Sequence, residues 1–510
     1  MKKKDLIVLD VANNHQGSVK HGLKLIKAHS EVLNKNSIVN AAFKFQFRNL
    51  DTFIHKKFKG STDVKHISRF EETRLSLKDY QILYDEIKNQ GYKTMCTAFD
   101  EESVESISKM KFDIIKVASC SADDWPLIEE VSKTNIPCII STGGLLIEDI
   151  DKIVSFAEHR RMDLSLMHCV SIYPMHPSYS NLLNIKMLKE RYPNVKVGWS
   201  THEDPNDSEI VMMAKSLGAE IFERHIGYKT ETVKLNAYSS TPLEIDKWLK
   251  SIKLSETILG SYERVIDKQE ISSLDELKRG VYLKKEKKSG QLLTNEDIYF
   301  AMPKIKNQLS SGKFKEGIKL KQDCDIDSIL DTTKIENPII SKTEHLYHYV
   351  HKVKAMLNLA KIDLGNEFNV EYSHHFGIQK FGDIGCILIQ CINREYCKKI
   401  LIQLPGQDHP FHYHKLKEET FQVLSGEMNL NIDGREKKLI PGDTSLVLPG
   451  TWHKFKTEVG FIAEEISTTH YSHDSVYKDS RINKMKREDR KTIVKHWGRF
   501  EIRNKLSDSI

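Results

Sequence analysis

The N-terminal half of this 510-residue chain predicts a closed α/β barrel of eight parallel strands, each followed by a helix. Three observations predict this fold. Eight short apolar runs occur in residues 5–225, segments with the helical spacing of apolar residues lie between them, and each run ends in a chemically capable polar residue. Continuous apolar runs of this length are typical of strands buried on both faces. Eight such units are enough to close one (β/α)8 barrel of the TIM type.

The eight runs are Asp5–His15, Ala41–Phe47, Lys93–Asp100, Asp113–Ser119, Pro137–Thr142, Leu164–Val170, Lys196–His202 and Glu220–His225. In barrels of this kind the active site lies at the carboxyl ends of the strands. The residues expected at those ends are Asp10, Lys44, Gln46, Lys116, Ser119, Ser141, His202 and His225. Any one of them could be an ordinary polar loop residue. Two lysines, two histidines and an acid converging from separate strands favour an active site.

Ordered motifs within these runs carry a resemblance to a known family. They are Asn14–Gly17, Lys44–Gln46, Lys116–Ser119, Ser141–Gly143, Leu166–Cys169, Tyr173–Pro174, Val197–His202 and Glu223–His225. Their order and spacing resemble the sialic acid (N-acetylneuraminate) synthase family from about Leu6 to Lys253. The resemblance implies a metal-dependent condensation of phosphoenolpyruvate with the open-chain aldehyde of an amino sugar. The products would be a 3-deoxy-2-ulosonic acid and phosphate.

Residue chemistry agrees with that reaction. The phosphate and carboxylate of phosphoenolpyruvate require lysines and hydroxyl donors, which Lys44, Lys116, Ser119 and Ser141 can supply. The resemblance implies that His202 and His225 hold the divalent metal, for which manganese is expected; their ligand type leaves iron, cobalt and zinc open. Asp10 stands where the family has Glu and is expected to act as an acid, a base or a water-orienting group. Further substrate contacts are expected from Gln46, Tyr173, Ser200 and Asn236.

Three departures from the family pattern concern the acceptor sugar. Ser121 stands where the family commonly has Glu, Ser171 where some members have Asn, and Asn236 where Asp is usual. A site built for hydrogen bonds discriminates strongly among acceptors. The expected acceptor is an N-acylated amino sugar such as N-acetylmannosamine or a relative. A phosphorylated or non-amino aldose, and a non-catalytic sugar-binding protein on a decayed synthase barrel, are the alternatives.

A small second region follows the barrel. The strings Arg279–Leu283, Ser289–Thr294 and Glu296–Ile298 resemble the antifreeze-like α+β domain of these synthases. In that family this domain is exchanged across a homodimer and lends an arginine to the partner's site, so a homodimer is expected. Here Met302-Pro303 stands where Arg-Pro is usual. A purely structural module is the alternative.

The third region carries the two motifs of an all-β cupin barrel. Gly406, His412, His414, Glu419 and Gly426 match the first motif, and Pro449–His453 matches the core of the second. His412 and His414, two apart on one strand, point to the same face. With Glu419 and His453 they are expected to bind a divalent transition metal, which could be Mn, Fe, Zn, Co or Ni. The alternative is a metal-free cupin that stiffens a dimer.

A weaker resemblance links the cupin to D-lyxose isomerases of the same fold. It rests on Glu464-Glu465 and on Tyr477–Arg481. A metal bridging a sugar's carbonyl and adjacent hydroxyl would make the cupin an aldose-ketose isomerase or an epimerase. A non-catalytic, sugar-binding cupin is the alternative.

The motifs together divide the chain into four parts. These are a synthase barrel (1–260), a linker with the antifreeze-like domain (261–334), the cupin (335–475) and a charged C-terminal segment (476–510). Net charge is +6, and the lysine-rich pieces are mixed with acids, so no nucleic-acid partner is expected. No signal peptide and no run of 18 apolar residues is found, so no membrane association is expected. The eight cysteines lack metal-site spacing, and a reduced, cytoplasmic protein is predicted.

Overall fold

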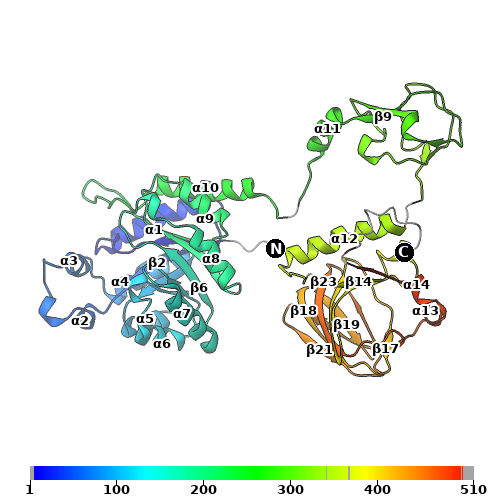
Figure 1. Cartoon of the computed structure of the whole chain (residues 1–510). Helices are drawn as coiled ribbons and strands as arrows, with labels where there is room; N and C mark the ends of the chain where they lie inside the picture. Colours follow the sequence, from blue (N-terminus) through cyan, green and yellow to red (C-terminus); the bar gives the residue numbers. More distant parts are fainter. Residues whose placement is uncertain (1–4, 263, 340–341, 366–367, 496, 498–510) are drawn as a thin grey trace. The chain divides into compact units, whose positions relative to one another are not determined.

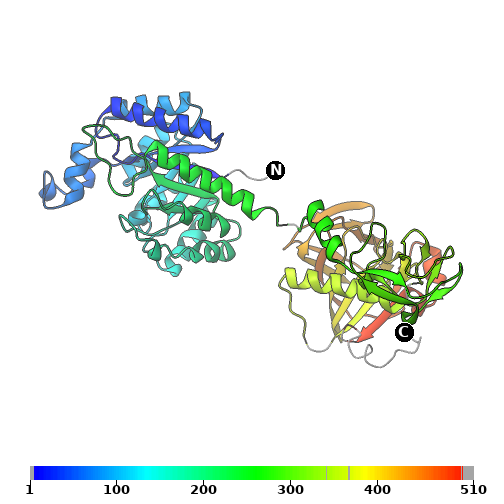
Figure 2. The same cartoon turned by 90° about the horizontal axis from the view of Figure 1, so that it is seen from above.

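The structure is a computed structural model that describes residues 5–262, 264–339, 342–365, 368–495 and 497. The chain divides into two compact units, Met1–Val265 and Ile266–Ile510 (Figures 1 and 2). Among the helices in the described ranges, none has both the length and the apolar composition that a membrane crossing needs.

The first unit is a closed barrel of eight parallel strands in sequential order. The strands are β1 (Leu6–Asp10), β2 (Ala41–Phe47), β3 (Lys93–Ala98), β4 (Ile114–Val117), β5 (Cys138–Ser141), β6 (Leu164–Cys169), β7 (Lys196–Thr201) and β8 (Ile221–His225). β1 pairs with β8, which closes the barrel, and Asp10 is in register with His225. The predicted (β/α)8 fold is confirmed.

Helices connect the strands around the outside of the barrel (Figure 1). They are α1 (Val19–Lys35), α4 (Leu77–Asn89), α5 (Glu101–Lys109), α6 (Trp125–Ser132), α7 (Ile147–Arg160), α8 (Leu183–Arg191), α9 (Glu209–Ser216) and α10 (Pro242–Leu259). Two further helices, α2 (Leu50–Phe53) and α3 (Lys65–Glu72), lie in the long connection after β2. The outward strand residues and the inward helix residues form one large hydrophobic cluster.

The barrel interior has an apolar layer and a polar layer. The apolar layer consists of Val8, Ala42, Met95, Ile114, Ile139, Met167 and Ile221. Side chains of a strand alternate between its two faces, so the residue two positions later in a strand faces the interior again. Two positions after Val8, Ala42, Ile114 and Ile221 come Asp10, Lys44, Lys116 and Glu223. The barrel core therefore changes from hydrocarbon to charge towards the carboxyl ends of its strands.

The second unit begins with α11 (Lys268–Leu277) and a group of short strands. β9 (Gly280–Leu283) pairs with β11 (Ile298–Ala301), and β12 (Ile318–Leu320) pairs with β10 (Leu292–Leu293) and with β13 (Ile335–Glu336). These strands enclose a small hydrophobic core of their own, which includes Val281, Leu293 and Ile318.

The cupin region has two antiparallel sheets. The larger sheet has the order β21 (Thr444–Val447), β18 (Glu419–Gly426), β23 (Phe461–Thr468), β16 (Tyr396–Gln403), β15 (Cys386–Asn393), β14 (Asn369–Ser373) and β25 (Lys491–Lys495). The smaller sheet has the order β20 (Arg435–Leu439), β19 (Met428–Ile432), β22 (His453–Lys456), β17 (His412–His414) and β24 (Ser475–Tyr477). An apolar cluster that includes Phe421 and Leu430 joins the two sheets.

The helix α12 (Lys342–Leu359) covers the outer face of the larger sheet (Figures 1 and 2). It packs on Val370 and Tyr372 of β14, so the residue between them, Glu371, points to the inner face.

The charged C-terminal segment contributes to both sheets. β24 pairs with β17, and β25 pairs with β14. Between them lie two short helices, α13 (Ser480–Lys484) and α14 (Arg487–Arg490). The structure thus joins residues 475–495 to the cupin, which the charge pattern did not indicate. Residues 496 and 498–510 of the predicted segment lie outside the described residues.

Candidate active sites

The polar layer of the barrel is organised around Glu223. One carboxylate oxygen of Glu223 accepts a hydrogen bond from Nζ of Lys44 at 3.1 Å, and the other accepts one from Nζ of Lys116 at 2.9 Å. Ser200 Oγ donates a third, 3.1 Å long. These side chains come from β2, β4, β7 and β8, so the closure of the barrel brings together charges that lie far apart in the sequence.

The charge state of this cluster follows from its burial. Burial opposes ionisation of Glu223, but Lys116 and Lys44 outweigh it and hold the pKa of that carboxyl well below its usual value. Burial lowers the pKa of Lys116, and the neighbouring Lys44 adds to that effect. Lys44 and Lys116 therefore lie side by side on one carboxylate, and an anionic substrate would compete with Glu223 for them.

Asp10 joins this cluster to the histidines. Its Oδ2 lies 3.0 Å from Nζ of Lys44 and 3.4 Å from Nδ1 of His225, and it accepts a hydrogen bond of 3.3 Å from Nε2 of Gln46. Asp10 is 1% exposed, so a carboxylate there is stable only with these partners. The shorter side chain of Asp10 therefore still reaches both the lysine and the histidine.

His202 and His225 lie next to each other at the carboxyl ends of β7 and β8, with ring centroids 5.4 Å apart. Nδ1 of His202 is 3.1 Å from the backbone oxygen of Val170, and Nδ1 of His225 faces Asp10. Each ring thus has Nδ1 engaged, which leaves Nε2 as the atom that can bind a metal. Burial lowers the pKa of His202 to about 3, so its ring is neutral, the form that ligates metals. The pair fits a divalent ion.

Aromatic rings cover this histidine pair. The ring of Tyr173 lies 4.2 Å from that of His202, and the ring of Tyr238 lies 5.2 Å from that of His225. Tyr173 is half exposed, so it lies at the mouth of the site rather than in the core.

The remaining expected residues differ in how closely they join the cluster. Ser119 accepts a hydrogen bond from the backbone N–H of Gly143, and Ser141 is buried at the end of β5. Asn236 is exposed, and its side chain accepts a hydrogen bond from the backbone N–H of Tyr238. The structure therefore brings together Asp10, Lys44, Gln46, Lys116, Ser200, Tyr173, His202 and His225. Ser119 and Ser141 lie at the carboxyl ends of β4 and β5, and Asn236 lies in the connection after β8, bonded to Tyr238.

Two residues of the site were not among the expected ones. Glu223 lies two residues before His225, so both point into the barrel, and that spacing was the available signal. Tyr238 lies in the irregular connection after β8, where no periodicity indicates which way a side chain points.

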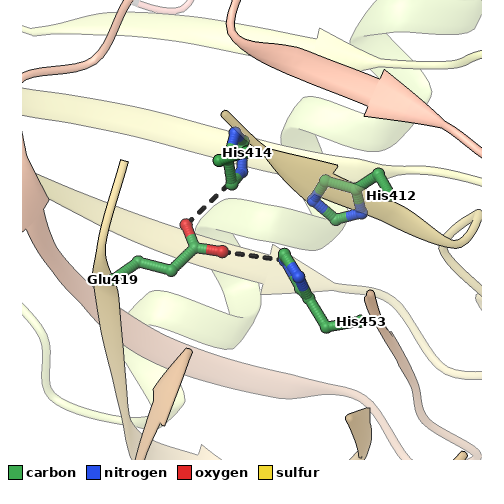
Figure 3. A group of neighbouring side chains, drawn as sticks. All are labelled: His412, His414, Glu419 and His453. Carbon is green, nitrogen blue, oxygen red and sulfur yellow. Dashed lines mark ion pairs between the residues drawn. The ribbon is translucent and has the colours of Figure 1, made fainter. Parts of the chain in front are cut away.

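The cupin region contains a second group of converging ligands (Figure 3). His412, His414, Glu419 and His453 are all buried, and their potential ligand atoms lie within 4.8 Å of one another. Nε2 of His453 lies 2.8 Å from one oxygen of Glu419, and Nε2 of His414 lies 3.6 Å from the other. His412 and His453 are direct partners in neighbouring strands.

A polar partner at Nδ1 fixes the orientation of each cupin histidine. Nδ1 of His412 is 3.1 Å from the backbone oxygen of Pro410, Nδ1 of His453 is 3.0 Å from that of Thr451, and Nδ1 of His414 is 3.2 Å from Ser475 Oγ. All three Nε2 atoms are thereby left for the interior. Three imidazole nitrogens and one carboxylate form a donor set that suits a divalent transition metal.

Comparisons with known proteins agree with the division of the chain into a barrel and a cupin. The NeuB family model matches residues 35–264, and the cupin domain model matches residues 400–460. An uncharacterized protein of Methanocaldococcus jannaschii is 31% identical over 299 residues, which cover 58% of this chain and 84% of that protein. The N-acetylneuraminate-9-phosphate synthase of Drosophila melanogaster is 34% identical over 227 residues, which cover 43% of this chain and 59% of the relative.

A solved structure extends the match. The crystal structure of a spore coat polysaccharide biosynthesis protein E from Chromobacterium violaceum is 40% identical, with a TM-score of 0.64. The similarity covers 66% of this chain and all of that one.

The barrel carries a charged cluster and a histidine pair at the carboxyl ends of its strands. These features define a (β/α)8-barrel enzyme whose active site lies at those strand ends. The chain belongs to the NeuB family, and it carries a cupin domain near its C-terminus.

Proposed function

We propose that the barrel condenses phosphoenolpyruvate with the open-chain form of an aldose, giving a 3-deoxy-2-ulosonic acid and phosphate. C3 of phosphoenolpyruvate bonds to the aldehyde carbon, water supplies the new oxygen at C2, and phosphate leaves. The observation that carries the proposal is the sharing of Glu223 by Lys44 and Lys116 beside the His202–His225 pair.

Lys44 and Lys116 are proposed to bind the phosphate and carboxylate of phosphoenolpyruvate, helped by the hydroxyls of Ser119 and Ser141. When the substrate enters, its negative charge replaces part of the contact that each ammonium makes with Glu223. Asp10 holds Nδ1 of His225 and is placed to move a proton at the reacting end of the site.

His202 and His225 are proposed to hold a divalent ion, manganese being the candidate, through Nε2. Such an ion, when bound, would supply Lewis-acid polarisation of the aldehyde. Gln46, Ser200 and Tyr173 are proposed to position substrates from around this centre.

The proposed acceptor is an N-acylated amino sugar such as N-acetylmannosamine. A phosphorylated aldose is the second candidate, and one observation favours it. A cavity of about 610 Å³ beside Gln46 is lined by Arg48 and Arg74, and the Arg48 guanidinium lies 3.5 Å from the ring centroid of Phe99. Arg74 already pairs with Asp51, so Arg48 is the arginine that is suited to an anionic group on the acceptor.

For the cupin we propose a metal-dependent reaction on a sugar, an aldose-ketose isomerisation or an epimerisation. The convergence of His412, His414, Glu419 and His453 supports it. A homodimer, an antifreeze-like role for residues 261–334 and a cytoplasmic location are part of the same proposal.

Phosphate release tests the barrel reaction. The full chain, Mn²⁺ and phosphoenolpyruvate are incubated with free and phosphorylated aldoses, and release is expected only with an acceptor. Lys116→Met removes a charge-assisted contact worth about 1.5 to 3 kcal/mol, so KM for phosphoenolpyruvate should rise at least about tenfold. No acceptor-dependent release with any aldose, from folded protein, would contradict the proposal.

A further inference from the structure

A cavity of about 360 Å³ lies on the inner face of the larger cupin sheet. Glu371, Gln390 and Lys399 line it from β14, β15 and β16, while His470 and Arg487 line it from the segments that follow β23 and β24. A cavity of this size suits a monosaccharide. None of these residues belongs to the His412–His453 group.

A chain of buried ion pairs connects this cavity to the proposed metal site. Lys399 Nζ lies 2.9 Å from Oε1 of Glu465, and Lys417 Nζ lies 2.9 Å from the same oxygen. Lys417 also pairs with Glu419, one of the four converging ligands. The side chains of Lys399, Lys417 and Glu465 are only 3–5% exposed. Water therefore screens little of the electrostatic interaction between a charge at the cavity wall and the proposed metal site.

The opposite wall of the cavity is built in the same way. Oε2 of Glu371 accepts a hydrogen bond of 3.1 Å from Nη2 of Arg487, and Oε1 of Glu371 lies 2.5 Å from Nζ of Lys491. Each of these inner carboxylates, Glu371 and Glu465, therefore has two cationic partners.

The balance of charge around the cavity is positive. Lys399 and Arg487 line the cavity together with one carboxylate, Glu371, while Lys417, Lys491 and Glu465 lie behind its wall. Glu419 pairs with Lys417, and Asp474 lies 3.5 Å from Nδ1 of His414, so both carboxylates near the proposed metal site already have partners. The metal site therefore does not supply the missing negative charge. An excess of cationic side chains at a cavity favours the binding of an anion.

Two nitrogen atoms at the cavity also lack partners. Within the described residues, Nε of Arg487 and Nδ1 of His470 are buried and make no hydrogen bond. Nε of an arginine is always a donor, and a buried donor without an acceptor is destabilising. Both residues line the same cavity, so a ligand that carries acceptor oxygens is suited to these two nitrogen atoms.

We propose that this cavity binds a charged monosaccharide, a sugar acid or a sugar phosphate, through its anionic group. The inference rests on the proposed sugar-directed function of the cupin and narrows its ligand to a charged monosaccharide. A carboxylate ligand would belong to the same chemical class as the ulosonic acid that the barrel is proposed to make. A phosphate ligand would instead place the cupin with a phosphorylated aldose.

Calorimetric titration of the full, Mn²⁺-loaded chain tests the proposal, with D-glucuronate, D-glucose 6-phosphate and D-glucose as probes. At least one anion is expected to bind at least tenfold more tightly than glucose. Lys399→Met and Arg487→Met should each weaken that anion at least tenfold. Arg487 is partly exposed, so its replacement keeps the test open should Lys399→Met fail to fold. Lys438→Met is the matched control, because Lys438 is an exposed lysine of the other sheet that pairs with Glu427.

Tighter binding of glucuronate would identify the ligand as a sugar acid. Tighter binding of glucose 6-phosphate would identify it as a sugar phosphate. Anion affinity that is unchanged in both cavity variants would overturn the inference, because the anion would then bind elsewhere. Glucose binding as tightly as both anions would also overturn it, yet would leave a sugar-directed cupin standing. Failure to bind any of the three would remove both the inference and the sugar-directed function.

Discussion

Oε2 of Glu223 lies 2.9 Å from Nζ of Lys116, in a pair whose side chains are 6% and 2% exposed. The other oxygen of the same carboxylate holds Lys44. Removing one partner of such a buried pair is strongly destabilising, because it leaves a buried charge without its counter-charge. Glu223 therefore keeps two ammonium groups charged and in place at the point where an anionic substrate is proposed to bind.

Replacing Glu223 by Gln should impair both activity and stability. The change leaves two buried cations with only Asp10 as a counter-charge, which should lower the free energy of unfolding by about 3–5 kcal/mol. Phosphate release should fall at least about a hundredfold, because the lysines lose the group that aims them. Glu220→Gln is the control, since Glu220 lies just before the same strand, at the opposite end of the barrel, and pairs with Lys189. A Glu223→Gln enzyme with unchanged turnover would show that the pairing is incidental.

Removing either barrel histidine should abolish condensation while the barrel stays folded. His202 and His225 lie at the catalytic end of the barrel, and neither belongs to its hydrophobic cores. His202→Ala and His225→Ala should each weaken metal binding by more than about a hundredfold, since loss of an outer partner alone costs about 10 to 100-fold. Metal content and phosphate release are measured after chelation and resupply of Mn²⁺, with the exposed His159→Ala as control. Full activity in both variants would show that residues other than His202 and His225 hold the metal.

The two sites should work independently. The double change His412→Ala and His414→Ala removes two of the four cupin ligands and should empty that site of metal. Condensation should stay within about twofold of the parent when the correct aldose is supplied, because the barrel has its own complete set of groups. Metal analysis and phosphate release check this. Loss of condensation in a folded double variant would mean that the cupin completes or orders the barrel site.

Stability should fall as the pH falls below neutrality, in part through His29. This ring is fully buried in α1, with Nδ1 2.9 Å from the backbone oxygen of Leu25, and burial lowers its pKa from 6.5 to about 4. Burial favours the neutral ring in the folded state. The contribution of His29 to the free energy of unfolding is therefore complete above pH 6.5 and is lost as the pH falls towards 4. A difference of this size corresponds to roughly 3 kcal/mol.

Thermal melting between pH 7.5 and pH 4.5 measures this effect. His29→Gln should make the melting temperature less dependent on pH, and the exposed His159→Gln should not. An equally steep dependence in His29→Gln would assign the acid sensitivity to other groups.

The barrel could be predicted from sequence because its signal is local. Each strand lies within a short apolar run, and three of the residues expected at the strand ends, Asp10, Ser141 and His225, are the last residues of β1, β5 and β8. The cupin ligands were equally accessible, since His412 and His414 are two residues apart and the motif fixes the other two.

Charges inside strands were harder to predict. Glu465 and Lys399 are neighbours only because β23 pairs with β16, and Glu371 meets Lys491 only because β14 pairs with β25. Such pairs depend on which strands lie together, and that arrangement is set by packing over the whole sheet rather than by local pattern. Lys491–Lys495 gave the same difficulty, because a short, lysine-flanked strand does not differ from a charged tail until its partner is known.

The central claim is that a new carbon–carbon bond forms in the barrel. The most direct test is mass spectrometry and NMR of products made from phosphoenolpyruvate labelled with ¹³C at C3, in the presence of Mn²⁺ and an N-acylated hexosamine. The account predicts a product whose mass is the sum of the aldose and pyruvic acid, with the label in a methylene group bonded to the former aldehyde carbon. Label recovered only in unreacted phosphoenolpyruvate or free pyruvate, across the free and phosphorylated aldoses tested, would contradict it.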